Sequence, residues 1–370
     1  MIPISMRMKR AVLCVPDPQN YIDQLDDYSI MIINPAAPEY RQNYLLDNAD
    51  WSLKITNTGY EQREGADYNN EKLFWYTSGT TGDSKFCSFS QNQIDLMAKT
   101  ICNAYDITSN DRYVTVMPLW HAHGQGFYWA TRQAGCETHF ITFTNVKDMI
   151  THRPTFVTAL PDLLNVIGQL DLKDLRFIRG ASAPMDHSLF QKLSAKFGVP
   201  VIEAFGMTEA LSHCFTNPLH GEQRIGTVGL PDGIEARIDQ DSRLWIRGPC
   251  MCQPDWYDTG DLAQQDEKGY FQIVGRSRDQ VNIKGYKINP ASIETQLKIL
   301  LPKLKSVAVF GHAVCNCVYV GDVESKVVAD AMQQINLLCR PRLIKQLDQI
   351  PLSQGDKISR SYLCKLFACK

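Results

Sequence analysis

A short segment rich in hydroxyl groups and glycine, residues 76–85 (YTSGTTGDSK), contains residue types that could bind phosphate. Glycine lets backbone N–H groups approach phosphate oxygens, hydroxyl groups add donors, and the closing Lys85 adds positive charge. The segment is not a Walker A loop, because the G-x-x-x-x-G-K-[ST] spacing is absent. By composition alone, a polar surface turn explains the segment equally well.

Two histidines, His121 and His123, lie beside Trp120 in the run MPLWHAHG at residues 117–124. An H-x-H pair without a third ligand at a suitable spacing is a weak indication of zinc. The wall of a pocket is the better interpretation. Buried packing against a strand at residues 113–117 is the alternative.

Length and composition indicate a folded protein with one large and one smaller domain. The chain has 370 residues, of which 44% are apolar and 21% charged, so a sizeable core can form. A net charge of −2 requires neither a nucleic-acid partner nor an anionic membrane. No apolar run approaches the roughly 20 residues of a membrane helix, and residues 1–18 do not look like a secretory signal. The twelve cysteines contain no C-x-x-C pair. We therefore expect reduced thiols, none of them catalytic, and a cytoplasmic location.

Three patterns of predicted secondary structure follow one another along the chain and indicate the elements that position these residues. Residues 91–205 alternate helical patterns, the first at 91–105, with short apolar strands, the last at 201–205. This alternation predicts an α/β domain whose mostly parallel sheet is covered by helices. Residues 206–275 predict short antiparallel strands, one of them at 243–247. Residues 278–370 predict a small α+β domain, whose first helix follows Asn289 as N-cap and Pro290 at the first helical position. We expect a large domain over residues 1–277 and a small mobile domain over residues 278–370.

Six further segments occur after the hydroxyl-rich loop in an order that resembles the adenylate-forming (AMP-binding) superfamily, which includes acyl-CoA synthetases, aryl-acid ligases, nonribosomal adenylation domains and luciferases. Residues 33–58 resemble the N-terminal subdomain of that superfamily, although the region ahead of residue 76 is shorter than usual. The six segments are MPLWHAHG at 117–124, RGASAP at 179–184, EAFGMTE at 203–209, YDTGD at 257–261, GRSRD at 275–279 continued by KGYKINP at 284–290, and PLSQGDKISR at 351–360.

The resemblance implies a role for individual residues. The ATP phosphates would meet Thr77, Ser78, Gly79, Thr80, Thr81, Gly82 and Lys85. Adenine would meet Gly180, Ala181, Ser182, Phe205, Gly206 and Thr208. Asp261 would bind the ribose with Arg276 nearby, and Glu209 would hold Mg²⁺. Lys357 would be the catalytic lysine and would also contact the nucleotide. His121 would act at the acid pocket, which Trp120, His123 and Ala204 would also line. Arg278 would be the hinge, and Gly285 would lie on the path of the thiol.

Simpler interpretations exist for several of these residues. Lys357 could be a solvated lysine on a loop, Asp261 the cap of a turn, and Arg276 half of a surface ion pair. Three positions depart from the usual motifs, because Ser84 replaces proline, Phe205 replaces tyrosine and Asp356 replaces glycine. None of these departures removes a reactive group.

The implied function is ATP-dependent activation of a carboxylic acid as an acyl-adenylate, with release of pyrophosphate. The acyl group then passes to the pantetheine thiol of CoA or of a carrier protein. Residues 120–123 offer no carboxylate for an α-ammonium group, which favours an aryl or acyl acid over an amino acid. Ala204, where glycine is common, favours a compact acid.

Two alternatives remain, a standalone amino-acid adenylating enzyme and a catalytically idle nucleotide-binding partner subunit. Basic residues of the small domain could meet an acidic carrier protein or form a solvated face; they are Lys284, Lys287, Lys298, Lys303 and Lys305.

Overall fold

The computed structural model describes residues 9–14, 18–22, 28–33, 35–37, 39–49, 53–56, 59–62, 71–77, 85–351 and 360–367. The chain divides into two compact units that interleave in sequence. One unit comprises Met1–Ala236, Ile246–Tyr257 and Asp266–Phe271, and the other comprises Arg237–Trp245, Asp258–Gln265 and Gln272–Lys370. Residues 278–370 fall wholly within the second unit. Their boundary at residue 278 and their mobility stay predictions.

A six-stranded sheet with the order β4-β3-β1-β2-β5-β6 begins the first unit. Strands β1, β2 and β3 pair in parallel, whereas β5 and β6 pair antiparallel with Thr77 opposite Lys85. The predicted phosphate loop therefore connects two neighbouring antiparallel strands. The elements of this region are β1 (Lys9–Cys14), α1 (Gln19–Ile22), β2 (Tyr28–Ile32), α2 (Glu39–Asn48), β3 (Leu53–Thr56), β4 (Gly59–Gln62), β5 (Leu73–Thr77) and β6 (Lys85–Phe89).

A seven-stranded sheet with the order β13-β12-β11-β10-β9-β7-β8 forms the centre of the first unit. Strands β7 to β11 pair in parallel, as the sequence predicts, and β12 and β13 extend the sheet antiparallel. Every residue of β9 and β10 is buried, which is typical of strands covered on both faces. The strands are β7 (Arg112–Thr115), β8 (Glu137–Phe140), β9 (Phe156–Ala159), β10 (Phe177–Gly180), β11 (Val201–Phe205), β12 (Phe215–Thr216) and β13 (Leu230–Pro231).

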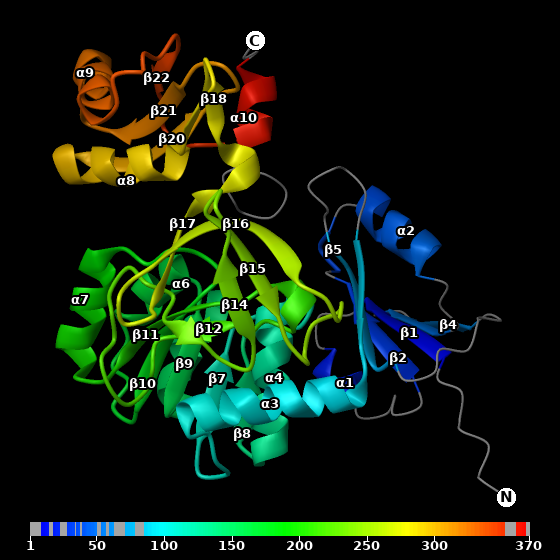
Figure 1. Ribbon diagram of the computed structural model, residues 1–370. Coiled ribbons are helices and arrows are strands. Elements are labelled where there is room, and N and C mark those ends of the chain that lie inside the picture. Colours follow the sequence, from blue (N-terminus) through cyan, green and yellow to red (C-terminus); the bar gives the residue numbers. More distant parts are fainter. Residues whose placement is uncertain are drawn as a thin grey trace, which may run out of the picture. The chain divides into compact units, whose positions relative to one another are not determined.

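Helices cover both faces of this sheet (Figure 1). Helices α3 (Gln91–Tyr105) and α4 (Ala122–Ala134) pack on one face, and α6 (Pro161–Ile167) and α7 (His187–Phe197) pack on the other. The prediction of α3 is confirmed at both ends, where Ser90 and Gln93 form a capping box at its start. Helix α4 was not predicted, because burial on nearly all sides removes the amphipathic pattern that identifies a surface helix. The first unit also contains α5 (Met149–His152).

The second unit contains most of a four-stranded sheet with the order β14-β15-β16-β17, followed by a small α+β region. The predicted N-cap is confirmed, since the Asn289 side chain accepts a hydrogen bond from the backbone N–H of Ala291 and Pro290 follows it. Helices α8 and α9 pack against the three-stranded sheet β20-β21-β22 (Figure 1). The elements are β14 (Glu235–Ile238), β15 (Arg243–Arg247), β16 (Tyr257–Gln265), β17 (Phe271–Arg276), β18 (Val281–Ile283), β19 (Tyr286–Ile288), α8 (Pro290–Leu300), β20 (Leu304–Phe310), β21 (Asn316–Gly321), α9 (Ser325–Ile335), β22 (Ile344–Gln346) and α10 (Arg360–Leu366).

Candidate functional site

The parallel strands of the central sheet bring three predicted segments to one edge. Strands β7, β9, β10 and β11 run in the same direction, so their carboxyl ends share an edge of the sheet. Residues 120–123 follow β7, residues 180–182 end and follow β10, and residues 205–209 end and follow β11. The ring nitrogen Nδ1 of His123 lies 3.2 Å from Oγ of Ser182, which joins the first two segments directly. In open α/β sheets, ligands bind at this edge.

The segment at the end of β10 combines buried and exposed groups. Gly180 and Ala181 are buried, and the backbone N–H of Ala181 donates to the carbonyl of Ala159 at 3.2 Å. Ser182 is exposed and has a φ of +71°. A left-handed backbone is strained for a residue other than glycine, and such strain is common at functional sites.

The segment at the end of β11 holds a partly buried aromatic ring, Phe205, whose edge packs on Phe215 at a centroid distance of 5.9 Å. Only glycine fits at position 206, because a Cβ atom there would lie 1.5 Å from the backbone oxygen of Ser212. Ala204 is buried within β11, and Thr208 begins a short 3₁₀ turn. The chain is therefore closely packed where it leaves the sheet.

Glu209 presents a partly buried carboxylate on this 3₁₀ turn. Its Oε1 accepts a hydrogen bond from the hydroxyl of Tyr257 at 3.2 Å, and its backbone oxygen accepts from the N–H of Cys252 at 2.8 Å. Among the residues that the structure describes, no group of three or more His, Cys, Asp or Glu side chains could hold a metal ion. Mg²⁺ in nucleotide sites binds through one or two carboxylates together with phosphate and water, and the role of Glu209 as its ligand stays a prediction.

Asp261 and Arg276 form an ion pair in the second unit. Oδ1 of Asp261 lies 2.9 Å from Nε of Arg276, and the two side chains are 4% and 46% exposed. Burial raises the pKa of Asp261, and Arg276 opposes that rise. Asp261 lies within strand β16, so the interpretation of it as the cap of a turn is wrong. Arg276 does form an ion pair, as its simpler interpretation as half of a surface ion pair predicts, but its partner Asp261 is buried.

The residues of the predicted hinge and thiol path lie on tight local structures. Arg278 belongs to a 3₁₀ turn, Ser277–Asp279, and its Nε lies 3.6 Å from Oδ1 of Asp279. Lys284 and Gly285 connect β18 and β19 with φ angles of +51° and +91°, the geometry of a type I′ hairpin turn. A Cβ atom at position 285 would have no neighbour within 4 Å among the described residues.

Several predicted residues fall outside this description. Ser78, Gly79, Thr80, Thr81, Gly82 and the predicted catalytic residue Lys357 lie outside the described residues. For Thr77 and Lys85 the structure describes the backbone, in β5 and β6. Trp120 is partly buried and His121 is exposed, at the start of α4. Their predicted roles stay predictions.

The structure adds one residue to which the sequence assigned no role of its own, the fully buried Arg179 of β10. Its side chain is 1% exposed and reaches under helices α3 and α4. Its Nε donates to the hydroxyl of Tyr105 at 2.8 Å, and its Nη1 lies 3.2 Å from Nε2 of His123 and 3.3 Å from Oγ1 of Thr158. An arginine inside the apolar strand Phe177–Gly180 was the available signal, since buried arginine is rare.

Burial and Arg179 together keep His123 uncharged. Burial, the nearby guanidinium and His121 together hold the pKa of His123 well below its usual value of 6.5, so the ring is neutral at neutral pH. Nε2 accepts hydrogen bonds from Arg179 and from the hydroxyl of Thr158, at 2.5 Å for the latter. The proton therefore sits on Nδ1 and is donated to Ser182. With both nitrogens engaged, His123 has no lone pair for a metal.

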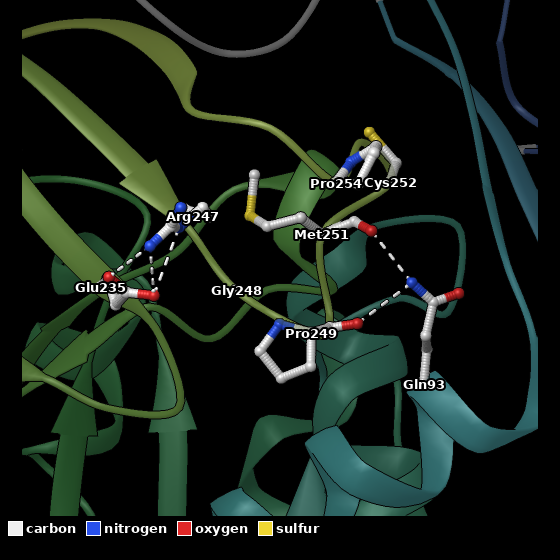
Figure 2. Close-up of a pocket in the computed structure, with 8 residues that line it drawn as sticks. All are labelled: Gln93, Glu235, Arg247, Gly248, Pro249, Met251, Cys252 and Pro254. Carbon is white, nitrogen blue, oxygen red and sulfur yellow. Dashed lines mark hydrogen bonds and ion pairs between the residues drawn. The ribbon is translucent and has the colours of Figure 1, made fainter.

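A separate surface pocket of about 490 Å³ lies elsewhere on the first unit (Figure 2). Its walls carry a bidentate ion pair between Arg247 and Glu235, and the amide of Gln93 donates to the backbone oxygens of Pro249 and Met251 (Figure 2). None of the predicted site residues lines it. We therefore do not place the active site in this pocket.

Comparison with known proteins supports the family that the motifs predict. The model of the family "AMP-binding enzyme" matches residues 23–253. A "probable CoA ligase" of Humulus lupulus is 29% identical over 352 residues, 81% of this chain and 67% of the relative. The oxalate–CoA ligase of Arabidopsis thaliana is 28% identical over 346 residues, 80% and 67% of the two chains. The sulfoacetate–CoA ligase of Cupriavidus necator is 25% identical over 341 residues, 78% and 65%. The matched parts thus span about two thirds of each relative.

Solved structures show the same fold at lower identity. ATP-bound MatB from Rhodopseudomonas palustris superposes with a TM-score of 0.84 at 20% identity, covering 98% of this chain and 90% of that one. The o-succinylbenzoate CoA synthetase of Bacillus subtilis, in complex with ATP and magnesium, gives 0.82 at 19% identity, covering 97% and 90%.

Family and fold together classify the protein. The chain belongs to the AMP-binding enzyme family and has its adenylate-forming α/β fold. Within that family its relatives are AMP-forming acid–CoA ligases, which adenylate a carboxylic acid and transfer it to CoA. Among the described residues, no helix has the length and apolar character to cross a membrane.

Proposed function

We propose that this protein activates a compact carboxylic acid with ATP, releases pyrophosphate, and transfers the acyl group to the thiol of CoA. The meeting of the predicted acid-pocket and adenine segments, in the contact between His123 and Ser182, is the observation that carries the proposal. The CoA ligase relatives support CoA as the acceptor. A carrier protein with a pantetheine arm is the second candidate, supported by the exposed lysines of the second unit.

The described residues fit a nucleotide and a divalent cation. Asp261 is a buried carboxylate that could accept hydrogen bonds from ribose hydroxyls. Phe205 offers an aromatic face at the edge where nucleotides bind. Glu209 offers a hard oxygen ligand for Mg²⁺, which would neutralise phosphate charge. Gly206 keeps the adjoining backbone free of a side chain.

The chemistry explains why the proposed site needs lysines. The carboxylate must attack the α-phosphorus of ATP, although both groups are anionic. Lys357 could lie between them, where a unit-charge pair at about 4 Å contributes about 4 kcal/mol at an effective dielectric of about 20, before desolvation. Lys85 would stabilise the pyrophosphate leaving group. Such catalysis is electrostatic positioning of an in-line displacement.

The compact size of the acid rests on the pocket residues and on the relatives. Ala204 is buried at the end of β11 and carries a methyl group where many family members have glycine. Two relatives act on small acids, oxalate and sulfoacetate. Residues 120–123 carry no carboxylate, so an amino-acid substrate would leave its ammonium group unpaired.

Pyrophosphate exchange over a panel of aryl, short acyl, fatty and amino acids tests this function, followed by thioester assays with CoA and with a phosphopantetheinylated carrier. We expect exchange with short acids and thioester formation on CoA. Exchange with amino acids alone would favour the amino-acid alternative. A folded protein that exchanges with no acid would favour the idle partner subunit.

The two half-reactions can be separated by substitution. Lys357→Ala should slow adenylation by roughly 10²–10³-fold, the usual cost of one charge-stabilising donor, yet still form thioester from a presynthesised acyl-adenylate. Gly285→Phe should do the reverse, because its side chain would obstruct the thiol. Gly285→Ala is the matched control, since it carries the same strain at φ +91° without the bulk. We expect residues 278–370 to rotate about Arg278 between the two steps, which removes Lys357 and presents Gly285 to the thiol. Equal loss of both half-reactions in both variants would contradict this rotation.

A further inference from the structure

Arg179 is a buried cation whose partners in the described part of the chain are all uncharged. Within the described residues, its guanidinium contacts the phenol of Tyr105, the imidazole of His123 and the hydroxyl of Thr158, and no carboxylate forms an ion pair with it. It also lies over the rings of Phe127 and Tyr105, at 5.0 and 5.8 Å from the centroids. Burial of a charge is unfavourable unless an opposite charge compensates it.

A second buried histidine lies in the same region. His213 is buried beside Tyr105 at a ring distance of 6.0 Å. Its Nε2 lies 2.7 Å from Asp232, and its Nδ1 is buried without a hydrogen-bond partner. Burial lowers the pKa of His213, Asp232 opposes that effect, and Arg179 adds to it. We call Arg179, His123 and His213, with Tyr105 and Thr158, the cationic cluster.

The cationic cluster reaches the surface at the edge where we place the acid. Arg179 contacts Nε2 of His123, and the opposite nitrogen of the same ring contacts the exposed Ser182. Trp120 and His121, the predicted pocket residues, precede His123 on the same segment. A ligand at Ser182 would therefore meet a hydroxyl that accepts from the N–H of His123, and the guanidinium of Arg179 lies on the other side of that ring.

We propose that the cationic cluster recognises a second acidic group, a carboxylate or sulfonate, on the acid that this enzyme activates. The proposal rests on the proposed function and narrows its substrate to short diacids. The hydroxyl of Ser182 accepts from the Nδ1–H of His123 and donates its own proton to this group, and Arg179 supplies the compensating positive charge behind His123. Arg179 is thus a residue that determines specificity without touching the substrate.

Matched acids of equal chain length test the proposal on the full chain: oxalate with acetate, malonate with propionate, and succinate with butyrate. Binding is measured by calorimetry, with and without a nonhydrolysable ATP analogue, and kcat/KM is measured by pyrophosphate exchange. We expect the wild type to bind at least one diacid tenfold or more tightly than its monoacid. Arg179→Met should lose that preference through KM, and the monoacid should be little affected.

Two further variants separate recognition from folding. Arg179→Lys keeps the charge and should retain part of the preference for the diacid. If Arg179→Met does not fold, the proposal stands or falls on whether Arg179→Lys weakens this preference. Arg176→Met is the control, because Arg176 belongs to a different ion pair, with Asp111 at 2.9 Å, and should leave the preference unchanged.

The two proposals fail differently. Diacid binding that depends on Arg179, without exchange, would uphold the cationic cluster and overturn the proposed function. Exchange with monoacids in preference to every diacid would uphold the function and overturn the cluster's role. Equal loss of diacid and monoacid binding in both Arg179 variants would also overturn it.

Discussion

Two buried arginines, Arg179 in the first unit and Arg360 in the second, differ in how their positive charge is compensated. The guanidinium of Arg360 binds both oxygens of Glu294 at 2.7 and 2.8 Å, one oxygen of Asp279 at 2.9 Å and the carbonyl of Val309 at 3.0 Å. All three charged side chains are 20% exposed or less. Arg179 has no such carboxylates among the described residues.

The difference indicates which charge the fold requires. Arg360 joins α10 to helix α8 and to the predicted hinge turn, so its charge is part of the architecture of the second unit. Arg179 leaves satisfied partners behind if it is removed, because Tyr105 also bonds Thr216 at 2.8 Å and His123 also bonds Thr158. A buried charge that the fold does not need is better explained by a ligand than by stability.

Arg360→Met should have the largest effect on stability. It leaves Glu294 and Asp279 without their cation, and breaking a buried ion pair from one side costs about 3–5 kcal/mol. Urea unfolding of the full chain, followed by a signal from the second unit, measures the loss. A change below about 1 kcal/mol would show that water replaces the arginine and would remove the contrast with Arg179.

Glu203→Gln tests a buried charge of the opposite sign. Burial raises the pKa of Glu203 from 4.5 to about 7, and its Oε2 has no hydrogen-bond partner. Because the folded pKa exceeds the unfolded one, the wild type loses stability as pH rises from 4.5 to about 7, on the order of 3 kcal/mol in total. Melting curves from pH 4.5 to 8 should therefore show the stability of the variant, relative to that of the wild type, increasing up to about pH 7. Parallel pH profiles would contradict the shifted pKa.

Asp261→Ala addresses the intermediate case, a buried carboxylate whose arginine partner is half exposed. If Asp261 binds the ribose, ATP affinity should fall by about 1.5–3 kcal/mol, because charge-assisted hydrogen bonds are lost. Calorimetry with ATP and Mg²⁺ measures it. Asp241→Ala is the control, since Asp241 is an exposed carboxylate in the same unit. Equal affinities in both variants would exclude the ribose role.

Arg179→Met should have the smallest effect on stability, within about 1 kcal/mol of the wild type, or should be stabilising. The methionine fills apolar space and removes an uncompensated charge, and replacing buried charges by apolar residues is often neutral or favourable. Urea unfolding without any acid present gives the value. A loss of several kcal/mol would mean that the fold itself needs Arg179.

The sequence by itself determined the family, the succession of three structural regions along the chain and the bounds of some elements. Helix α3, strand β11 and strand β15 begin and end where the pattern predicts, because periodicity, caps and turn residues act over a few neighbouring positions. The motifs likewise identified candidate residues one segment at a time.

Only the tertiary structure decided how those segments meet. Helix α4 is buried on nearly all sides, so no amphipathic pattern marked it, and the partner of Asp261 stands fifteen residues away on the next strand. The state of Arg179 depends on Tyr105, His123 and Thr158, which belong to three different elements. Burial and charge compensation are sums over neighbours that are distant in sequence, so no local pattern could have shown that this arginine lacks a carboxylate partner within the described part of the chain.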